Sequence, residues 1–345
     1  MRIVVAMSGG VDSSVVAGLM HAAGHEVIGV TLQLYDHGAA AGRKGACCAG
    51  QDIHDARNVA DRLGIAHYVI DAEAAFRKAV IADFAESYAT GKTPVPCVRC
   101  NQHLKFGDLL GLARDLGAEA LATGHYVRRE QGRDGAELHR AADAARDQSW
   151  FLFATTRDQL EFARFPLGSM PDKAEVRAHA ASMGLQVADK PDSQDICFVP
   201  SGSYADIVTK LRPDAALPGD IVDQDGTVLG SHQGIARYTV GQGKRLGAAS
   251  GRVVTEIDAG RRRLVVGPRG TGSRRVRLAE PNWLIEPPGT PFRATVKLRA
   301  RETPQDAEID AATGIVTLDT AALAAPGQAC VIYDGTRVLG GGFIV

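Results

Sequence analysis

The sequence predicts an α/β fold, in which a doubly wound parallel sheet is followed by two small β-rich domains. Short apolar runs alternate with helix-periodic segments over residues 1–123, and this alternation is typical of a parallel sheet covered by helices on both faces. Beyond about Pro213 the helical period fades, and Gly, Pro and Asp residues separate short Val/Ile-rich runs. This change predicts domains at residues 1–211, 212–278 and 279–345.

The expected elements follow one another in a regular order. Strands are expected at residues 2–7, 26–34, 66–71 and 118–123, and helices at 12–23, 52–63, 72–89 and 101–116. Parallel sheets of this kind bind ligands beyond the carboxyl ends of their strands. A binding site is therefore expected in the loops that follow Met7, Leu34 and Thr123. In the second half of the chain, the turn residues at 223–226 predict a β-hairpin.

Composition is that of a globular protein rather than a membrane or fibrous one. The 345 residues exceed the size of a single hydrophobic core, and 45% of them are hydrophobic and 23% charged. No apolar run is long enough to span a membrane, and the segment after Met1 lacks the pattern of a secretory signal. A cytoplasmic protein with reduced thiols and no membrane partner is expected.

The charge of the chain is unevenly distributed. The formal net charge of −1 at pH 7 argues against a wholly basic nucleic-acid binder. Residues 252–301 nevertheless carry twelve Lys/Arg against four Asp/Glu. Such a stretch is either a surface that contacts RNA or a solvated face, and composition leaves both interpretations open.

The strongest local motif follows the first expected strand. Its residues are Ala6, Met7, Ser8, Gly9, Gly10, Val11, Asp12, Ser13 and Ser14. Glycines let the backbone approach a phosphate, and the N–H groups of a helix start and the serine hydroxyls can donate to its oxygens. The Gly-Lys-Ser/Thr ending of a P-loop is missing, so pyrophosphate is a better ligand than a transferred γ-phosphate. An ordinary Gly-rich turn before a capped helix is the simpler alternative.

Two cysteine segments are the next distinctive feature. Cys97 and Cys100 lie in a proline-containing loop, and Cys197 follows almost a hundred residues later. A helix expected from Asn101 would place Cys100 at its N-terminus, where a thiolate is stabilised. Cys97 and Cys100 could instead form half of a zinc or iron–sulfur site, or a redox pair. The remaining cysteines are expected to pack or to act locally: Cys47, Cys48 and Cys330.

These motifs together resemble a known family. The loop at residues 8–14 resembles the signature of the ATP pyrophosphatases, which adenylate a carbonyl or carboxylate and release pyrophosphate. With the cysteine segments, the chain resembles the bacterial tRNA-specific 2-thiouridylase family, which forms 2-thiouridine at the wobble position of tRNA. The matching segments run through the whole chain, at residues 45–48, 55–57, 93–101, 122–126, 147–149, 192–198, 232–235, 238–242, 264–267, 326–328 and 340–342.

The resemblance implies a role for particular residues. ATP would be bound by Ala6, Met7, Ser8, Gly9, Gly10, Val11, Asp12, Ser13, Leu32 and Gly124, and Asp12 would also help to position Mg²⁺, with no other metal site. The anticodon stem-loop of tRNA would contact Val95, Pro96, Cys97, His125, Arg146, Asp147, Gln148, Arg299, Ala300 and Gln328. Cys197 would accept sulfane sulfur from a persulfide donor protein, and Cys100 would free that sulfur and can close a disulfide with Cys197.

The chain departs from the family pattern at several of these positions. Cys97 stands where relatives commonly carry an acidic residue, and Arg146 where lysine is usual. Ala300 replaces a frequent aromatic residue, and the order of residues 243–245 is Gly-Lys-Arg rather than Arg-Lys-Gly. The departures affect the expected RNA contacts rather than the activation loop.

Two other functions remain open from sequence. An iron–sulfur-dependent RNA thiolase would use Cys97 and Cys100 to hold a cluster, and the protein would then be coloured. A non-catalytic RNA-binding protein would retain the loop only to sense nucleotide, although binding alone needs neither Cys100 nor Cys197. His125 taken alone is as well explained as a strand-end histidine with a satisfied hydrogen bond.

Overall fold

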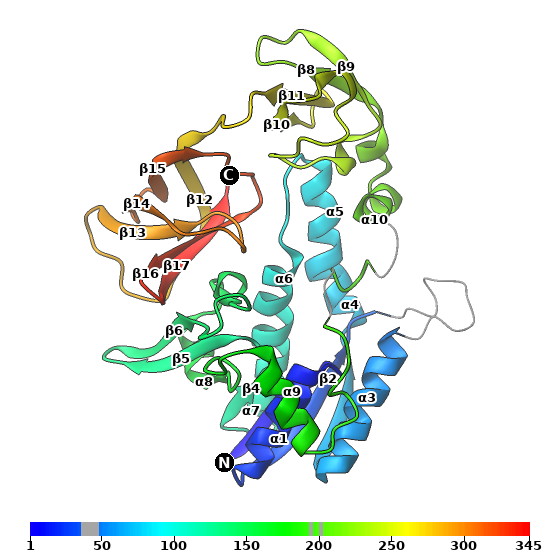
Figure 1. Cartoon of the computed structure of the whole chain (residues 1–345), viewed down its shortest axis with the longest axis vertical. Coiled ribbons are helices and arrows are strands. Elements are labelled where there is room, and N and C mark those ends of the chain that lie inside the picture. Colours follow the sequence, from blue (N-terminus) through cyan, green and yellow to red (C-terminus); the bar gives the residue numbers. More distant parts are fainter. Residues whose placement is uncertain (36–47, 193–195, 200–202) are drawn as a thin grey trace. The chain divides into compact units, whose positions relative to one another are not determined.

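The computed structural model describes residues 1–35, 48–192, 196–199 and 203–345 (Figure 1). The chain divides into two compact units. Unit 1 comprises residues 1–79, 98–194 and 336–338, and unit 2 comprises residues 80–97, 195–335 and 339–345. Among the described residues, no helix combines the length and the apolar character that crossing a membrane requires.

Unit 1 is built on a five-stranded parallel sheet. Its order is β3-β2-β1-β4-β7, from β1 (Arg2–Ala6), β2 (Glu26–Gln33), β3 (Ala66–Asp71), β4 (Ala120–Ala122) and β7 (Ala163–Arg164). Every neighbouring pair is parallel. The predicted parallel sheet is therefore confirmed. The two-residue β7 is an addition, because it is too short to leave an apolar run in the sequence.

Helices alternate with these strands and continue along the chain to Leu211 (Figure 1). They are α1 (Val11–Ala22), α3 (Cys48–Leu63), α4 (Glu73–Phe76), the π-helix η1 (Arg77–Ile81), α5 (Ala82–Ala89), α6 (Pro96–Arg99), the π-helix η2 (Cys100–Leu109), α7 (Leu110–Asp115), the 3₁₀ turn η3 (Ser149–Leu152), α8 (Arg157–Phe162), α9 (Lys173–Ser182) and α10 (Tyr204–Leu211). Of these, α5 and α10 belong to unit 2. The helix expected at 72–89 is confirmed as the continuous run of α4, η1 and α5.

One helix begins earlier than the sequence predicted. The helix expected from Asn101 starts at Pro96, and α6, η2 and α7 follow one another without a break. Proline is favoured at the first position of a helix, because the N–H group that it lacks has no partner there. Cys97, and not Cys100, therefore lies in the first turn. The prediction that Cys100 stands at a helix N-terminus is wrong.

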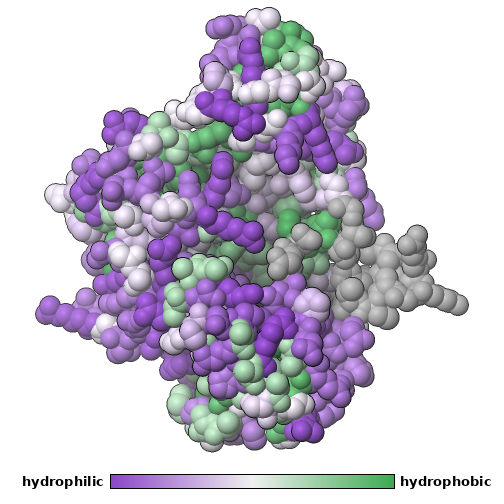
Figure 2. Space-filling model, in the orientation of Figure 1, coloured by the Kyte–Doolittle hydropathy of each residue, from purple (hydrophilic) through white to green (hydrophobic). Residues whose placement is uncertain are grey.

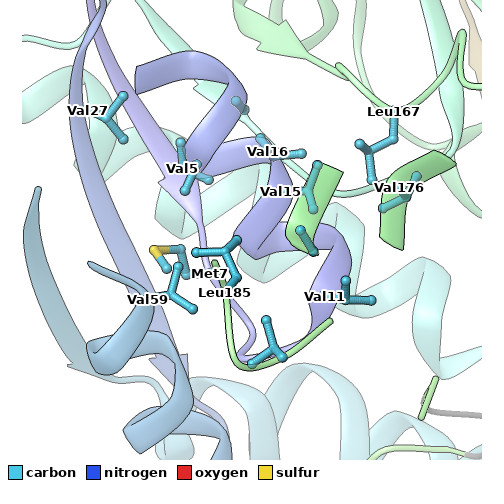
Figure 3. Packing of buried hydrophobic residues seen from close by; sticks show 14 of the residues in the cluster. Val5, Met7, Val11, Val15, Val16, Val27, Val59, Leu167, Val176 and Leu185 are labelled. Atoms are coloured by element: carbon cyan, nitrogen blue, oxygen red, sulfur yellow. The ribbon is translucent and has the colours of Figure 1, made fainter. Parts of the chain in front are cut away.

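The core of unit 1 lies between the sheet and its helices. In Figure 3 the side chains of Val5, Val16 and Val59 point into one cluster, and they come from β1, α1 and α3. Val176 of α9 joins the same cluster. Val5 and Val16 are fully buried, as expected for a strand and a helix that are covered on the side of the core. This packing fixes the start of α1, which follows the glycine loop.

Unit 1 also contains a hairpin that the sequence analysis did not predict. Strands β5 (Val127–Gly132) and β6 (Gly135–Arg140) pair antiparallel, and Arg337 pairs with His139 of β6. Both strands carry charged residues and are partly exposed, so neither leaves an apolar run. The turn residues are Arg133 and Asp134, and the sequence signal for the turn was Asp134 followed by Gly135, the first residue of β6.

Unit 2 contains two β structures. The first is a four-stranded sheet of order β10-β11-β8-β9, from β8 (Gly219–Val222), β9 (Val228–His232), β10 (Val253–Asp258) and β11 (Arg263–Gly267). The hairpin predicted at 223–226 is confirmed, since β8 and β9 pair antiparallel around it. Asp223 N–H donates to the Thr227 carbonyl oxygen (3.0 Å), and Gly226 has a φ of +85°.

The second β structure is a closed six-stranded barrel. It consists of β12 (Ser273–Trp283), β13 (Phe292–Lys297), β14 (Gln305–Asp310), β15 (Ile315–Ala322), β16 (Ala329–Asp334) and β17 (Arg337–Ile344). Pairing runs β12-β15-β14-β13-β16-β17, and a further pairing of β12 with β17 closes the circle. Cys330 is fully buried in this core, and burial raises the pKa of its thiol to about 12, so the predicted core role is confirmed.

Hydrophilic residues predominate on the face drawn in Figure 2, and hydrophobic ones are scattered among them. Tyr68 and Val228 are among the large apolar side chains that remain exposed. Such scattered exposure is normal for a folded chain and needs no partner to explain it.

Candidate active site

The loop after β1 has the geometry of an anion cradle. Gly9 has a φ of +74°, and a Cβ there would lie 2.1 Å from the Asp52 carbonyl oxygen, so only glycine fits. Ser8 N–H donates to Ser13 Oγ (3.1 Å), and the hydroxyls of Ser8 and Ser13 lie 3.3 Å apart. Gly10 caps α1 without a side-chain bond. Two hydroxyls and the first N–H groups of a twelve-residue helix thus meet at one point.

Other residues predicted to bind nucleotide lie at the same edge of the sheet. A Cβ on Gly124, which follows β4, would lie 3.0 Å from Asp12 Cβ and 3.0 Å from the Ser13 nitrogen. Thr31 Oγ1 in β2 donates to the Met7 carbonyl oxygen (2.7 Å), and Leu32 is the next residue of that strand. Parallel strands end at one edge, so the glycine loop, Gly124 and the end of β2 are brought together.

Asp12 is the first member of a chain of alternating charges. Its Oδ1 accepts hydrogen bonds from Tyr126 Oη (2.6 Å) and Lys173 Nζ (2.6 Å). Lys173 also pairs with Asp192 (2.8 Å), which in turn pairs with Arg146 (2.7 Å). Burial raises the pKa of Asp192, but hydrogen bonds from Lys173 and Arg146 outweigh this and leave it below its ordinary value. The network joins the glycine loop to Arg146, one of the residues predicted to contact tRNA.

Lys190 holds the other side of the loop. Its Nζ donates to the Gly9 carbonyl oxygen (3.0 Å) and to Asp52 Oδ1 (2.7 Å), and it also bonds Asp55. Burial lowers the pKa of Lys190, and the two carboxylates more than restore it, so the net shift is upward. A cation that bonds a loop carbonyl in this way fixes the direction in which the N–H groups of the loop point.

Tyr126, Lys173 and Lys190 are site residues that sequence reasoning missed. The Lys173 contact with Asp12 spans 161 residues, and the Lys190 contact with Gly9 spans 181. A single sequence carries no signal for such pairs. Tyr126 did lie in a matched segment, but nothing in that segment indicated a bond to Asp12.

The Arg146 segment has a structural as well as an electrostatic role. The Asp147 side chain is 3% exposed, and its carboxylate accepts from Arg140 Nε (3.2 Å) and from the hydroxyl of Ser149 (3.0 Å). Gln148 Oε1 accepts from the Tyr126 backbone N–H (2.8 Å). These two side chains are directed to the protein itself, and their bonds hold Arg146 in place.

His125 has both ring nitrogens engaged. Thr123 Oγ1 lies 2.8 Å from Nδ1, and Lys105 Nζ lies 3.4 Å from Nε2. Burial first, and then the Lys105 ammonium, holds the pKa of His125 well below its ordinary value. The imidazole is therefore neutral at physiological pH, and its Nε2 accepts a hydrogen bond from the Lys105 ammonium.

The cysteines differ in exposure. Cys97 is exposed in the first turn of α6, whereas Cys100 is 8% exposed at the start of η2. Cys197 is exposed, and the adjacent Phe198 packs edge-on against Phe84 of α5 (5.2 Å between centroids). Cys100 belongs to unit 1 and Cys197 to unit 2. The matched residues 45–47 and 193–195 lie outside the described residues.

The barrel holds the segment that leads to Cys97. Thr93 N–H donates to the Pro326 carbonyl oxygen (2.7 Å), and Gln328 Nε2 donates to the Thr93 carbonyl oxygen (3.0 Å). A Cβ on Gly327, whose φ is +87°, would lie 3.0 Å from both the Thr93 nitrogen and oxygen. The turn at 326–328 is thus fitted to Thr93, and Val95 follows two residues later.

Arg299 and Ala300 follow β13 in the barrel. Arg299 is exposed, Ala300 is half-buried, and Arg299 Nη2 lies 3.4 Å from the Leu323 carbonyl oxygen. Val95 and Pro96 are buried. Of the positions expected to meet RNA, those with exposed side chains in unit 2 are therefore Cys97 and Arg299.

Comparison with known proteins decides the family. Three family profiles match in succession: the tRNA methyl transferase HUP domain at residues 1–201, its PRC-barrel domain at 206–268, and the aminomethyltransferase beta-barrel domain at 273–344. The tRNA-specific 2-thiouridylase MnmA of Acidiphilium cryptum is 84% identical over 345 residues, which is 100% of both chains. The chain belongs to the tRNA-specific 2-thiouridylase family.

Other members of the 2-thiouridylase family are also similar over nearly their whole length. The MnmA of Gluconobacter oxydans is 64% identical over 100% of this chain and 99% of its own. The MnmA of Paracoccus denitrificans is 57% identical over 99% of this chain and 91% of its own. Among solved structures, a 4-thiouridine synthetase–RNA complex with bound ATP has a TM-score of 0.38 at 16% identity, covering 62% of this chain and 50% of that one, which is too weak a similarity to bear on function. The predicted family and fold class are confirmed.

Proposed function

We propose that this protein is an ATP-dependent tRNA sulfurtransferase that converts wobble uridine to 2-thiouridine. The observation that carries the proposal is the anion cradle at Ser8 and Ser13, in a chain 84% identical to a tRNA-specific 2-thiouridylase. The cradle accounts for activation by ATP, and the cysteines account for the sulfur. Methyl transfer, which two of the profile names mention, needs neither feature.

Activation comes first in the proposed reaction. The C2 carbonyl of uridine does not exchange its oxygen for sulfur until that oxygen becomes part of a leaving group. The oxygen attacks the α-phosphorus of ATP, and pyrophosphate leaves into the cradle, where Ser8, Ser13 and the N–H groups at the start of α1 neutralise its charge. Leu32 and Gly124 would hold the adenine and ribose at the same sheet edge.

The carboxylate of Asp12 is suited to coordinate Mg²⁺. Mg²⁺ in ATP-dependent enzymes is usually held by one or two carboxylates together with substrate phosphates. Asp12 stands beside the cradle, and its Oδ1 is engaged by Tyr126 and Lys173. Bound there, Mg²⁺ would neutralise phosphate charge. Lys173 and Tyr126 would keep the carboxylate in position.

Sulfur delivery follows activation. Cys197 would carry a sulfane sulfur received from a persulfide donor protein. This sulfur attacks C2, and AMP departs with the former carbonyl oxygen. Cys100 attacks Cys197 Sγ and breaks its bond to the sulfane sulfur, so that a Cys100–Cys197 disulfide forms and the two electrons that the sulfur gains come from the two thiols. An external thiol reductant then restores both cysteines.

The anticodon stem-loop of tRNA is the proposed macromolecular substrate. Val95, Pro96 and Cys97 would surround the target base, which can be splayed out of its exposed loop. The other contacts would come from His125, Arg146, Arg299, Ala300 and Gln328, with Asp147 and Gln148 acting through their hold on Arg146.

We also propose the domain boundaries 1–211, 212–278 and 279–345, which the positions of the three profiles support, and a cytoplasmic location, where tRNA is available.

The test is product formation with a matched pair of serine variants. The protein is incubated with ATP, Mg²⁺, a persulfide source and unmodified tRNA, and 2-thiouridine is measured by mass spectrometry of the digested nucleosides. Ser13→Ala should slow its formation roughly 10- to 100-fold, because a donor to a charged group is lost. Ser14→Ala is the control. Both hydroxyls donate to the Gly10 carbonyl oxygen at the N-cap of α1 (Ser14 2.9 Å, Ser13 3.2 Å), but only Ser13 Oγ also lies beside Ser8 Oγ (3.3 Å) in the cradle. Product formed without ATP, or equal rates for the two variants, would overturn the proposal.

A further inference from the structure

Four cations gather around one turn of unit 2, and only Arg299 among them is assigned a contact in the proposed function. We call this set the cation cluster, and it consists of Lys244, Arg245, Arg269 and Arg299. A Cβ on Gly241 would lie 2.9 Å from Arg299 Nη2, and a Cβ on Gly243 would lie 3.1 Å from Arg269 Nη2. The arginines that follow β11 and β13 therefore both reach the turn that carries Lys244 and Arg245.

The backbone of this turn is fixed in an uncommon conformation. Arg245 has a φ of +64°, in the left-handed region that residues other than glycine rarely adopt. Tyr238, which is 6% exposed, donates from its hydroxyl to the Arg245 carbonyl oxygen (3.1 Å). Gln242 Nε2 donates to the Lys244 carbonyl oxygen (2.9 Å). Such a conformation persists where the surroundings enforce it, and it is frequent where a loop binds a ligand.

The cluster carries charge that nearby carboxylates do not neutralise. All four side chains belong to exposed residues, and within the part of the chain that the structure describes none of them forms an ion pair. Residues 238–255 contain no Asp or Glu. Other arginines of unit 2 are paired, such as Arg261 with Asp258 (3.3 Å) and Arg293 with Asp319 (2.6 Å). Arg275 and Arg277 are also exposed and form no ion pair among the described residues, so what distinguishes the cluster is that its members meet at one turn.

We propose that the cation cluster binds the phosphodiester backbone of tRNA, outside the positions that read the target base. The inference rests on the proposed function and adds Lys244, Arg245 and Arg269 to the RNA-contacting surface. Arginine forks match phosphate oxygens, and the missing side chains of Gly241 and Gly243 let the guanidinium groups of Arg299 and Arg269 lie against the turn. Contacts of this kind position a nucleic acid without reading its sequence.

The test compares two double variants that remove the same charge. Binding of unmodified tRNA to the full chain is measured at several salt concentrations. The Arg245→Gln, Arg269→Gln variant should lose roughly 1.4 to 1.8 from the slope of log K against log salt, because each phosphate contact contributes roughly 0.7 to 0.9. The Arg261→Gln, Arg293→Gln variant should keep the wild-type slope, since its arginines are paired with carboxylates. Equal thermal unfolding midpoints of the two variants establish that both are folded.

The outcomes separate the inference from the function on which it rests. The cluster does not bind RNA if both variants show the same slope of log K against log salt, or if that slope falls only in the Arg261→Gln, Arg293→Gln control. The proposed function stands in either case. If the wild type binds no tRNA at any salt concentration, the proposed function fails and the inference fails with it. If the cluster variant keeps its tRNA slope but loses salt-sensitive binding of an acidic protein, the cluster serves a protein partner and the inference is overturned.

Discussion

At the scale of single residues, Cys97 and Cys100 are one helical turn apart and differ in exposure. The helix begins at Pro96, so the backbone N–H groups of the first turn surround Cys97 rather than Cys100. The electrostatic reason for preferring Cys100 as the nucleophile therefore fails. The assignment of Cys100 as the nucleophile rests on the family match alone. Substituting Cys97 and Cys100 separately tests it.

We predict that Cys100→Ser abolishes formation of 2-thiouridine and that Cys97→Ser retains most of it, because only Cys100 is needed to release sulfur from the carrier. Cys197→Ser should also abolish the product, since serine cannot hold a sulfane sulfur, while ATP and tRNA binding persist. Single-turnover assays with a persulfide donor measure all three variants. An active Cys100→Ser protein beside an inactive Cys97→Ser protein would reverse the assignment.

A second residue-scale prediction concerns acid stability and His125. Burial and Lys105 hold its folded pKa well below the ordinary 6.5. As the pH falls below about 6.5, the unfolded chain binds a proton at this position that the folded chain does not bind, so stability is lost on acidification and not above that pH. His125→Gln should therefore lose less unfolding free energy than the wild type between pH 7.5 and pH 5 in denaturant titrations. The exposed His21→Gln is the control, and a His125→Gln profile parallel to the wild type would contradict the prediction.

At the scale of elements, the turn at 326–328 is predicted to position the segment that carries Val95 and Cys97. Gly327→Ala would push a methyl group against Thr93, and activity on tRNA should fall by about 10- to 100-fold because small displacements near reacting groups cost this much. Gly335→Ala is the matched control. Gly335 also has a positive φ (+56°), but a Cβ there meets nothing within 4 Å.

Both glycine variants should lose about 1–2 kcal/mol of stability because alanine is strained at a positive φ, and Gly327→Ala should lose somewhat more because its Cβ also meets Thr93. Thermal unfolding measures this loss, and kcat and KM for tRNA measure the activity. If Gly335→Ala reduces activity as much as Gly327→Ala, general strain explains the loss and the positioning role of the turn is refuted.

Element by element, the sequence was informative where burial leaves a pattern. The strands at 2–7 and 26–34 were predicted within a residue of their ends, because each is an apolar run in a covered sheet. The strand at 66–71 was also predicted correctly, although it is the edge strand of the sheet and is only partly buried. The hairpin of β5 and β6 was missed because charged, half-exposed strands leave no such run. The start of α6 was missed because Pro96 was interpreted as a loop residue rather than as the first residue of a helix.

The candidate site shows the same division. The glycine loop could be predicted because its function depends on local backbone freedom, which Gly9 and Gly10 reveal. Lys173 and Lys190 could not be, because their bonds to Asp12 and Gly9 exist only after the chain has folded. Asp147 matched the family at a position expected to meet RNA, and only the structure reveals that its carboxylate is turned inward.

At the scale of the whole molecule, the chain combines a parallel-sheet unit that carries the ATP cradle with β structures that hold a cysteine segment and a cation cluster. In the proposed reaction these parts supply activation, positioning of the base and the sulfur, and electrostatic capture of RNA. In this mechanism the oxygen of uridine C2 is adenylated before sulfur attacks.

The most direct measurement follows that oxygen. Unmodified tRNA labelled with ¹⁸O at C2 of the wobble uridine is incubated with the protein, ATP, Mg²⁺ and a persulfide source, and the nucleotide products are analysed by mass spectrometry. Adenylation predicts one ¹⁸O atom in AMP for each 2-thiouridine formed, with none in pyrophosphate. Label found in inorganic phosphate together with ADP, or 2-thiouridine formed while AMP stays unlabelled, would contradict the account.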